Sequence, residues 1–214
     1  MSEEKTLSAQ QRAIAPIAAA AATGDMERLN PSLKQGLDAG LSIGDCKEVL
    51  VQLYAYAGFP RSLNALAELM KVLEERKQSG IHDSSGRDPG PLPKGAELLA
   101  VGTTNQTRLA GAPVKGPIFD FAPAIDQYLK THLFGDIFAR DNLDWESREL
   151  TTVAALAAMQ GVDAQLQAHM RISMNVGLTP SQLLEFADVL GERVDATVAG
   201  RARAALERQL YAAK

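Results

Sequence analysis

The apolar residues of the chain recur mainly at intervals of three and four positions, which is the spacing of one face of an α-helix. The segment that follows Ser42 shows the pattern clearly, with alternating steps of three and four: Ile43, Cys46, Leu50, Leu53 and Ala57. Alanine and leucine, which favour helices, are abundant, and β-branched residues are scattered. The sequence therefore predicts an all-α fold.

Start and stop signals set approximate limits for the predicted helices. Ser8 and Gln11 have the spacing of a capping box, and Gly24 is placed to end the helix that follows. The first half is predicted to hold four helices, which end near Thr23, at Gly40, before Gly58 and Pro60, and at Gln78. In the second half, Asp144 is the predicted N-cap of a helix to about Met159, the next helix ends before Gly177, and Thr179, Pro180 and Gln182 begin a third.

The composition changes between Ser79 and Pro123. Glycine and proline are concentrated from Gly86 to Gly95, and more of them follow up to Pro123. A connection of this length is unusual unless it covers a surface or carries function, so we expect it to be ordered against the helices. The predicted organisation is a helical unit over residues 1–80, a linker over 81–123 and a second helical unit over 124–214.

The two helical units repeat one another. Leu7 to Ala22 overlays Leu143 to Ala158, so that Arg12 matches Arg148. With one extra residue in the second unit, Gly24 matches Gly161, Gly40 matches Gly177 and Glu48 matches Glu185. Two such copies predict a duplicated helical domain in which each half buries its apolar face against the other around a pseudo-twofold axis.

Composition and charge exclude several classes of function. The formal net charge of −4, without a long basic stripe, gives no electrostatic footprint for nucleic acid or an anionic membrane. The longest apolar run, residues 13–22, is too short to span a bilayer, and residues 1–6 lack the pattern of a secretory signal. We therefore expect a cytoplasmic protein. The single cysteine and three histidines lack the spacing of a metal site, and no phosphate-binding or dinucleotide-binding motif is present.

The second unit resembles the carboxymuconolactone decarboxylase family. The residues that carry the resemblance occur in order: Arg148-Glu149-Leu150, His169, Asn175-x-Gly177, Leu178-Thr179 and Glu185. The first unit looks like a divergent copy that keeps a Tyr-x-Gly-x-Pro tail at Tyr56, Gly58 and Pro60. The resemblance implies the all-α architecture of alkyl hydroperoxidase D-like proteins and a homo-oligomer, expected to be a trimer of duplicated chains. It also implies a decarboxylase that uses no cofactor, as do the members that act on γ-carboxymuconolactone.

Alkyl hydroperoxidase D-like relatives use a Cys-x-x-Cys pair that is followed four residues later by histidine. This sequence keeps His169 but has Val162 and Gln165 at the two cysteine positions. Dithiol chemistry needs one sulfur to attack and one to resolve, so its mechanism is lost. Cys46 lies on an apolar helical face, where a free cysteine is usually a core residue. A peroxidase relative that has lost its cysteine pair remains an alternative.

The candidate acid–base pair is His169 with Glu149. His169 lies on the same helical face as Leu166 and Met170 and should point into the interior. The unperturbed pKa of a histidine side chain, near 6.5, suits proton transfer at neutral pH. Residue type alone also allows a buried, hydrogen-bonded histidine, but the resemblance aligns His169 with the histidine of the family. Glu149 is interpreted as a partly desolvated carboxylate that orients the ring, or alternatively as a solvated glutamate near a helix start. The first copy has Ala13 and Ser32 at these two positions, which predicts one site per chain.

Three further residues are candidates because of the resemblance. The run from His132 to Arg140 is similar to a segment of the decarboxylases, and Gly135 with Asp136 is expected to form a turn that places His132 near the site. Arg140 and Arg148 are candidates for holding a substrate carboxylate through a two-point fork. Tyr54 and Tyr56 are expected to pack against a neighbouring site or to fill an interface.

The leading hypothesis is a carboxymuconolactone decarboxylase-like lyase that acts on a small cyclic carboxylate or lactone without cofactor or metal. An arginine would hold the carboxylates, and His169, steered by Glu149, would hand a proton to carbon. A non-catalytic ligand-binding or scaffold protein is the alternative from another class. A cavity at His169 and Glu149 would favour the enzyme, whereas side chains that fill this space would favour the scaffold.

Overall fold

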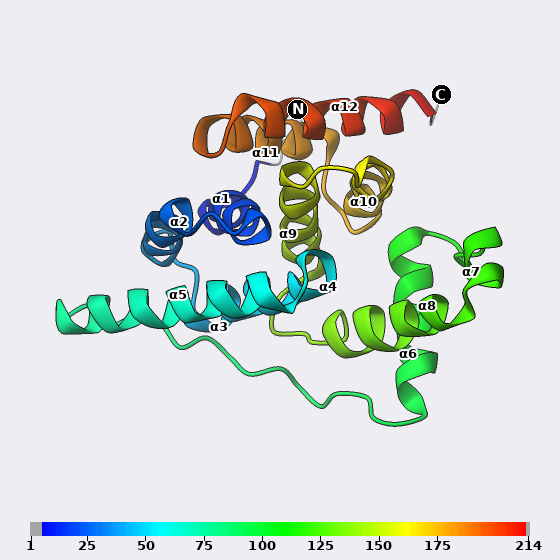
Figure 1. The fold of residues 1–214 in the computed structure, drawn as a ribbon, viewed down its shortest axis with the longest axis horizontal. Coiled ribbons are helices and arrows are strands. Elements are labelled where there is room, and N and C mark those ends of the chain that lie inside the picture. The colour runs from blue at the N-terminus through cyan, green and yellow to red at the C-terminus, as the bar shows by residue number, and fades with distance from the viewer. Residues whose placement is uncertain (1–5, 213–214) are drawn as a thin grey trace, which may run out of the picture.

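The computed structural model describes residues 6–212, and every regular element in this part of the chain is a helix (Figure 1). The predicted all-α fold is therefore confirmed. Residues 1–5 lie outside the described residues. The expectation that no secretory signal is present concerns this part of the chain. Within the described range, no helix combines the length and the apolar character needed to cross a membrane.

Five helices make up the first copy: α1 (Ala9–Thr23), α2 (Met26–Asp38), α3 (Ile43–Gln52), α4 (Tyr54–Ala57) and α5 (Phe59–Gln78). Ser8 forms the predicted capping box with Gln11, and Ser42 forms another with Asp45. The helix predicted to run from Ser42 to Gly58 is divided, because α3 ends at Gln52 and the short α4 follows it.

The second copy begins with α8 (Pro123–Tyr128) and the π-helix η1 (Leu129–Ile137), and continues with α9 (Trp145–Ala158), α10 (Asp163–Asn175), α11 (Pro180–Arg193) and α12 (Ala196–Ala212). Asp144 and Thr179 are N-caps as predicted, since the side chain of each accepts a hydrogen bond from the backbone three residues later. These caps fix where α9 and α11 begin.

The two copies meet along α1 and α9, which lie next to each other at the centre of the molecule (Figure 1). Both helices are rich in buried alanine, whose small side chain lets two helices approach closely. Arg12 of the first copy pairs with Glu185 of the second, with 2.6 Å between Nε and Oε1. Arg148 of the second copy pairs with Glu48 of the first, with 2.9 Å between Nη2 and Oε2. Residues that match in the sequence overlay thus form equivalent pairs across the interface, which is the geometry of a pseudo-twofold axis.

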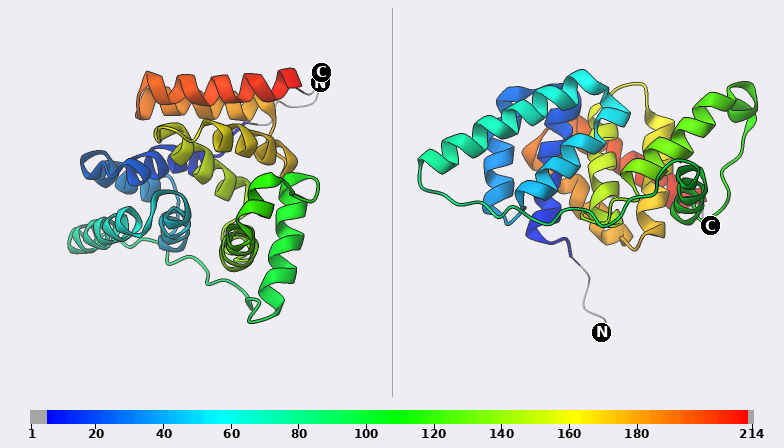
Figure 2. Two further views of the ribbon diagram at one scale, coloured as in Figure 1. Left: turned by 45° about the vertical axis from the view of Figure 1, so that its right-hand side comes forward. Right: turned by 90° about the horizontal axis from the view of Figure 1, so that it is seen from below.

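The segment 81–123 contains two helices that the sequence analysis did not predict, α6 (Glu97–Ala110) and α7 (Pro117–Phe121). Its extended first part runs below α3, where the amides of Ile43 and Gly44 donate hydrogen bonds to the carbonyls of Ser84 and Ser85 (Figure 2). The expectation that this segment is ordered against the helices is therefore confirmed for its first part.

Helix α6 packs along η1 and builds a second hydrophobic cluster beside the main core. The turn predicted at Gly135 and Asp136 is wrong, because both residues lie inside η1. Gly135 instead allows close packing, since a Cβ there would approach the Leu98 carbonyl oxygen to 2.9 Å. A Cβ at Gly102 would overlap the Lys130 carbonyl, so the contact requires glycine on both helices.

Candidate functional site

Glu149 and His169 come together at the contact between α9 and α10. Nδ1 of His169 lies 2.7 Å from Oε2 of Glu149, within hydrogen-bonding distance. The side chain of Glu149 is completely buried and that of His169 is 11% exposed. The interpretation of Glu149 as a solvated residue near a helix start is therefore wrong, because α10 covers it. The hydrogen bond occupies Nδ1 and leaves Nε2 as the ring atom available to another group.

Tyr56 of the first copy completes this cluster. Its ring meets the His169 ring edge-on, with 5.8 Å between the centroids and 80° between the planes. Among the described residues, Oε1 of Glu149 is buried without a hydrogen-bond partner, and the buried Tyr56 hydroxyl interacts with Thr152. Burial raises the pKa of Tyr56 above its ordinary value, and the nearby Glu149 carboxylate raises it further, so the hydroxyl stays protonated. The cluster therefore holds a neutral hydroxyl close to a carboxylate whose Oε1 has no hydrogen-bond partner within the described part of the chain.

From the sequence, Tyr56 is expected to pack against a neighbouring site or to fill an interface, and it is not among the predicted site residues. The available signal was its place in the Tyr-x-Gly-x-Pro tail of the first copy, whereas Glu149 and His169 lie in the second copy. The pseudo-twofold arrangement brings the tail of one copy onto the acid–base pair of the other. The site is thus built from both copies, which the sequence of either copy alone does not reveal.

The contacts of His132 are with residues other than Glu149 and His169. Its Nδ1 is 2.6 Å from Oδ2 of Asp136, one turn along η1, and its side chain is about half exposed. Its ring is tilted against Tyr54, with 5.4 Å between the centroids. Tyr54 and Tyr56 both belong to α4, so this short helix contacts each of the two candidate histidines.

The candidate arginines both bind Glu48. Arg140 forms a two-point fork with it, with Nε–Oε2 2.9 Å and Nη2–Oε1 2.7 Å. Arg148 is fully buried, and its Nη2 also donates to the Arg140 carbonyl at 2.9 Å. Burial alone would raise the pKa of Glu48, but hydrogen bonds from Arg140, Arg148 and Asn142 outweigh it and lower the pKa to about 2. Both guanidinium groups are therefore paired with a carboxylate of the other copy, Arg140 through Nε and Nη2, and the structure does not bring them onto His169.

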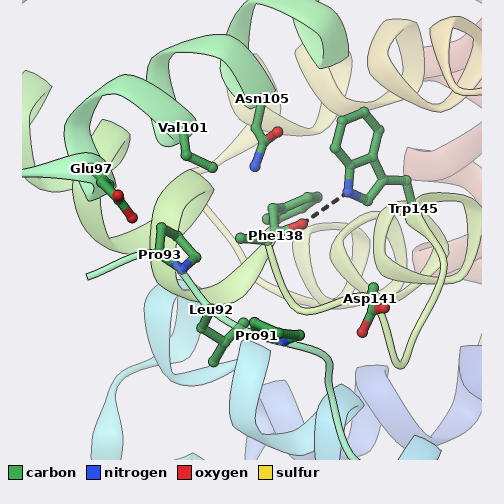
Figure 3. Close-up of a pocket in the computed structure, with 10 residues that line it drawn as sticks. Pro91, Leu92, Pro93, Glu97, Val101, Asn105, Phe138, Asp141 and Trp145 are labelled. Atoms are coloured by element: carbon green, nitrogen blue, oxygen red, sulfur yellow. Dashed lines mark hydrogen bonds between the residues drawn. The ribbon is translucent and has the colours of Figure 1, made fainter.

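Two sizeable cavities lie away from the Glu149–His169 pair. One, of about 530 Å³, is bounded by residues 91–93, α6 and the start of α9 (Figure 3). Its floor includes Phe138, whose carbonyl accepts a hydrogen bond of 2.9 Å from Nε1 of Trp145. The other, of about 430 Å³, lies between α3 and α5 and has Arg140 in its wall. Neither cavity is lined by His169 or Glu149, so side chains cover the pair on these sides.

The cluster does not contain sulfur. Burial raises the pKa of the Cys46 thiol to about 12, and Asp45 and Asp83 add to the effect. Such a thiol is almost entirely protonated at neutral pH and is a poor nucleophile. Within residues 6–212, no three side chains of histidine, cysteine, aspartate or glutamate are grouped as metal ligands would be.

Comparison with known families agrees with the internal repeat. The model of the carboxymuconolactone decarboxylase family matches residues 1–70 and 123–208, which together make up more than half of the chain. The two matched segments fall in the two helical copies, and the unmatched residues 71–122 include the end of α5 and the intervening segment with α6 and α7. No curated protein sequence is significantly similar to the chain. The chain belongs to the carboxymuconolactone decarboxylase family and carries two tandem copies of its helical domain.

Proposed function

We propose that the protein is a cofactor-free lyase that decarboxylates a small cyclic carboxylate or lactone, with His169 as the proton donor and Glu149 as its positioning partner. The observation that carries the proposal is the 2.7 Å hydrogen bond between two buried side chains on adjacent helices. A buried carboxylate that binds Nδ1 fixes the orientation of the ring and stabilises the imidazolium form. That arrangement is what proton delivery from Nε2 requires.

In the proposed reaction the bond between the ring carbon and the departing carboxylate breaks, and its electron pair remains on the substrate as a delocalised enolate. CO2 leaves, and the proton on Nε2 of His169 forms the new C–H bond. The neutral imidazole is then reprotonated from solvent. Tyr56 limits the rotation of the His169 ring through its edge-on contact.

Neither of the two large cavities is lined by His169, whose side chain is 11% exposed. This same observation favours a second candidate, a ligand-binding protein that keeps the family fold without turnover. The proposal also includes a cytoplasmic homo-oligomer, expected to be a trimer. Self-association is supported by apolar side chains that project into solvent, among them Phe59 and Phe121. Light scattering coupled to size exclusion measures the number of copies.

The test is turnover of γ-carboxymuconolactone and related lactone or aromatic carboxylates, followed by CO2 release. A reaction run in D2O should place one deuterium on the product carbon, visible by NMR. His169→Gln should lower kcat by about 10²–10⁴ while circular dichroism stays unchanged. His82→Gln is the matched control, because His82 is exposed in the extended segment and far from α10 along the chain.

Two results would remove the proposal. Full activity of His169→Gln on a confirmed substrate would show that another group delivers the proton. Saturable binding of these acids that is lost in His169→Gln, without CO2 release from the unmodified protein, would favour the ligand-binding protein. Glu149→Gln separates orientation from folding, because it should lower kcat and move the pH profile while KM stays nearly constant.

A further inference from the structure

The cavity between α3 and α5 has the dimensions and the two-sided chemistry of a ligand site. Its volume of about 430 Å³ lies within the range of small-molecule pockets. One wall is apolar and is formed by Val51 of α3 and by Leu66, Leu69, Met70 and Leu73 of α5. The facing wall is polar and comes from the extended segment 85–88 and residues 140–142. We call this cavity the α3–α5 pocket.

The polar wall carries an unbalanced positive charge. Glu48 is the only carboxylate hydrogen-bonded to two guanidinium groups among the described residues, those of Arg140 and Arg148. Among the residues that line the pocket, Lys47, Arg87 and Arg140 are positive and Glu48 and Asp88 are negative, which leaves one net positive charge. Arg148 is completely buried, whereas the Arg140 side chain is 28% exposed and lies in the pocket wall. The excess charge is therefore accessible from the pocket through Arg140.

The other charged groups of the pocket do not cancel this excess. Arg87 pairs with Asp141, with 3.1 Å between Nη1 and Oδ1. Asp88 interacts electrostatically with Arg140 and raises the pKa of its guanidinium, whereas Lys47 is a further exposed cation of the lining. Asn142 donates a hydrogen bond of 3.0 Å to Glu48 and carries no charge. An anion placed at Arg140 would therefore neutralise the remaining positive charge.

The pseudo-twofold counterpart shows that the excess charge is specific to this side. Glu185, which matches Glu48, binds one guanidinium, that of Arg12. The side chain of Arg12 is 47% exposed, so water can stabilise its charge. The duplicated framework thus needs one arginine for each glutamate, and Arg140 is an addition that faces the pocket.

We infer that the α3–α5 pocket binds a small amphipathic carboxylate, either a medium-chain or an aromatic acid. The carboxylate would bind Arg140, and the apolar body would lie along the leucines of α5. The extended segment covers the pocket and is anchored to α3 by the hydrogen bonds from Ile43 to Ser84 (2.8 Å) and from Gly44 to Ser85 (3.0 Å). This site is separate from the Glu149–His169 pair, which does not line it.

The test is isothermal titration calorimetry of the full chain with octanoate, and with octanol and octylamine as probes of the same length. Octanoate should bind saturably with one molecule per chain, and both other probes should bind at least about tenfold more weakly. Arg140→Met and Leu73→Glu should each weaken octanoate binding at least about tenfold, because one removes the charge and the other repels the anion. Leu73 is half-buried, so circular dichroism is used to check that the Leu73→Glu variant folds.

Matched controls separate this site from others. Arg12→Met breaks the counterpart ion pair, and Leu184→Glu places the same charge on an exposed leucine of α11. Both variants, and His169→Gln, should bind octanoate as the unmodified protein does. Any of three results would overturn the inference: no saturable binding, equal binding of octanol and octanoate, or loss of binding in His169→Gln but not in Arg140→Met.

Discussion

Replacing Glu48 by glutamine tests whether the ion pairs between the two copies hold the fold together. Glutamine keeps the shape of the side chain but removes the charge that faces Arg140 and Arg148. The Glu48 side chain is 5% exposed and that of Arg148 is completely buried, so water does not replace the lost partner. Removing one member of a buried ion pair typically costs about 3–5 kcal/mol, because the other charge stays buried and uncompensated.

The pKa of Glu48 gives an independent magnitude. Its fall from an ordinary 4.5 to about 2 corresponds to about 3 kcal/mol of stability. Because the folded-state pKa is the lower one, this stabilisation is fully present above about pH 4.5 and is lost as the pH falls towards 2. We therefore expect Glu48→Gln to lower the free energy of unfolding by about 3 kcal/mol at neutral pH, and by less than half of that near pH 3.

The assay is urea denaturation followed by far-UV circular dichroism at one protein concentration. Glu185→Gln is the matched control, because it breaks the equivalent pair with Arg12 at a site where the side chains are 26% and 47% exposed. An exposed pair contributes about 0–1 kcal/mol, so this variant should lose at most about 1 kcal/mol. Equal losses in the two variants, or a Glu48→Gln loss that does not shrink at low pH, would refute the argument.

Two further predictions concern packing and reactivity. Gly102→Ala should lower the free energy of unfolding by about 1–3 kcal/mol in urea, because its Cβ would overlap the Lys130 carbonyl, whereas Gly200→Ala in open space on α12 should raise it by up to about 1 kcal/mol. If both changes have the same effect, the close contact of α6 with η1 is not limiting. Cys46 should react with a disulfide reagent at neutral pH only after urea unfolds the chain, because burial keeps its pKa near 12; rapid reaction of the folded protein would contradict this.

The helix limits could be predicted from the sequence where local interactions set them. Ser8, Ser42, Asp144 and Thr179 each bond to a backbone amide three residues away, so the sequence around each cap contains the whole signal. Helix α6 differs, because it has no side-chain cap and gains its stability from η1. Asn105, for example, is buried and donates a hydrogen bond of 2.9 Å to the Phe134 carbonyl. A contact of this kind cannot be inferred from the segment itself.

The candidate site likewise has residues that could be predicted from the sequence and contacts that could not. Glu149 and His169 were selected because the family resemblance aligns them with its glutamate and histidine, and the structure places them within hydrogen-bonding distance of each other. Whether Arg140 and Arg148 bind substrate depends on what already occupies their guanidinium groups. Their partner, Glu48, lies in the other copy, so its identity follows from tertiary structure rather than from local sequence.

The two halves of the molecule differ in which of these residue pairs they contain. The arginine–glutamate pair occurs on both sides of the pseudo-twofold axis, as expected for a contact that each half needs in order to bury the other. The acid–base pair occurs once, and the positions that match Glu149 and His169 hold Ala13 and Ser32.

On that second side Ala13 instead lines a cavity of about 230 Å³ together with Arg193, the residue that takes the place of Tyr56. Small side chains have therefore replaced the acid–base pair without loss of the surrounding helices. A framework that tolerates this exchange does not need Glu149 and His169 for folding. The desolvation of that buried pair is then a cost that folding does not explain, which is the strongest structural argument that the pair serves chemistry.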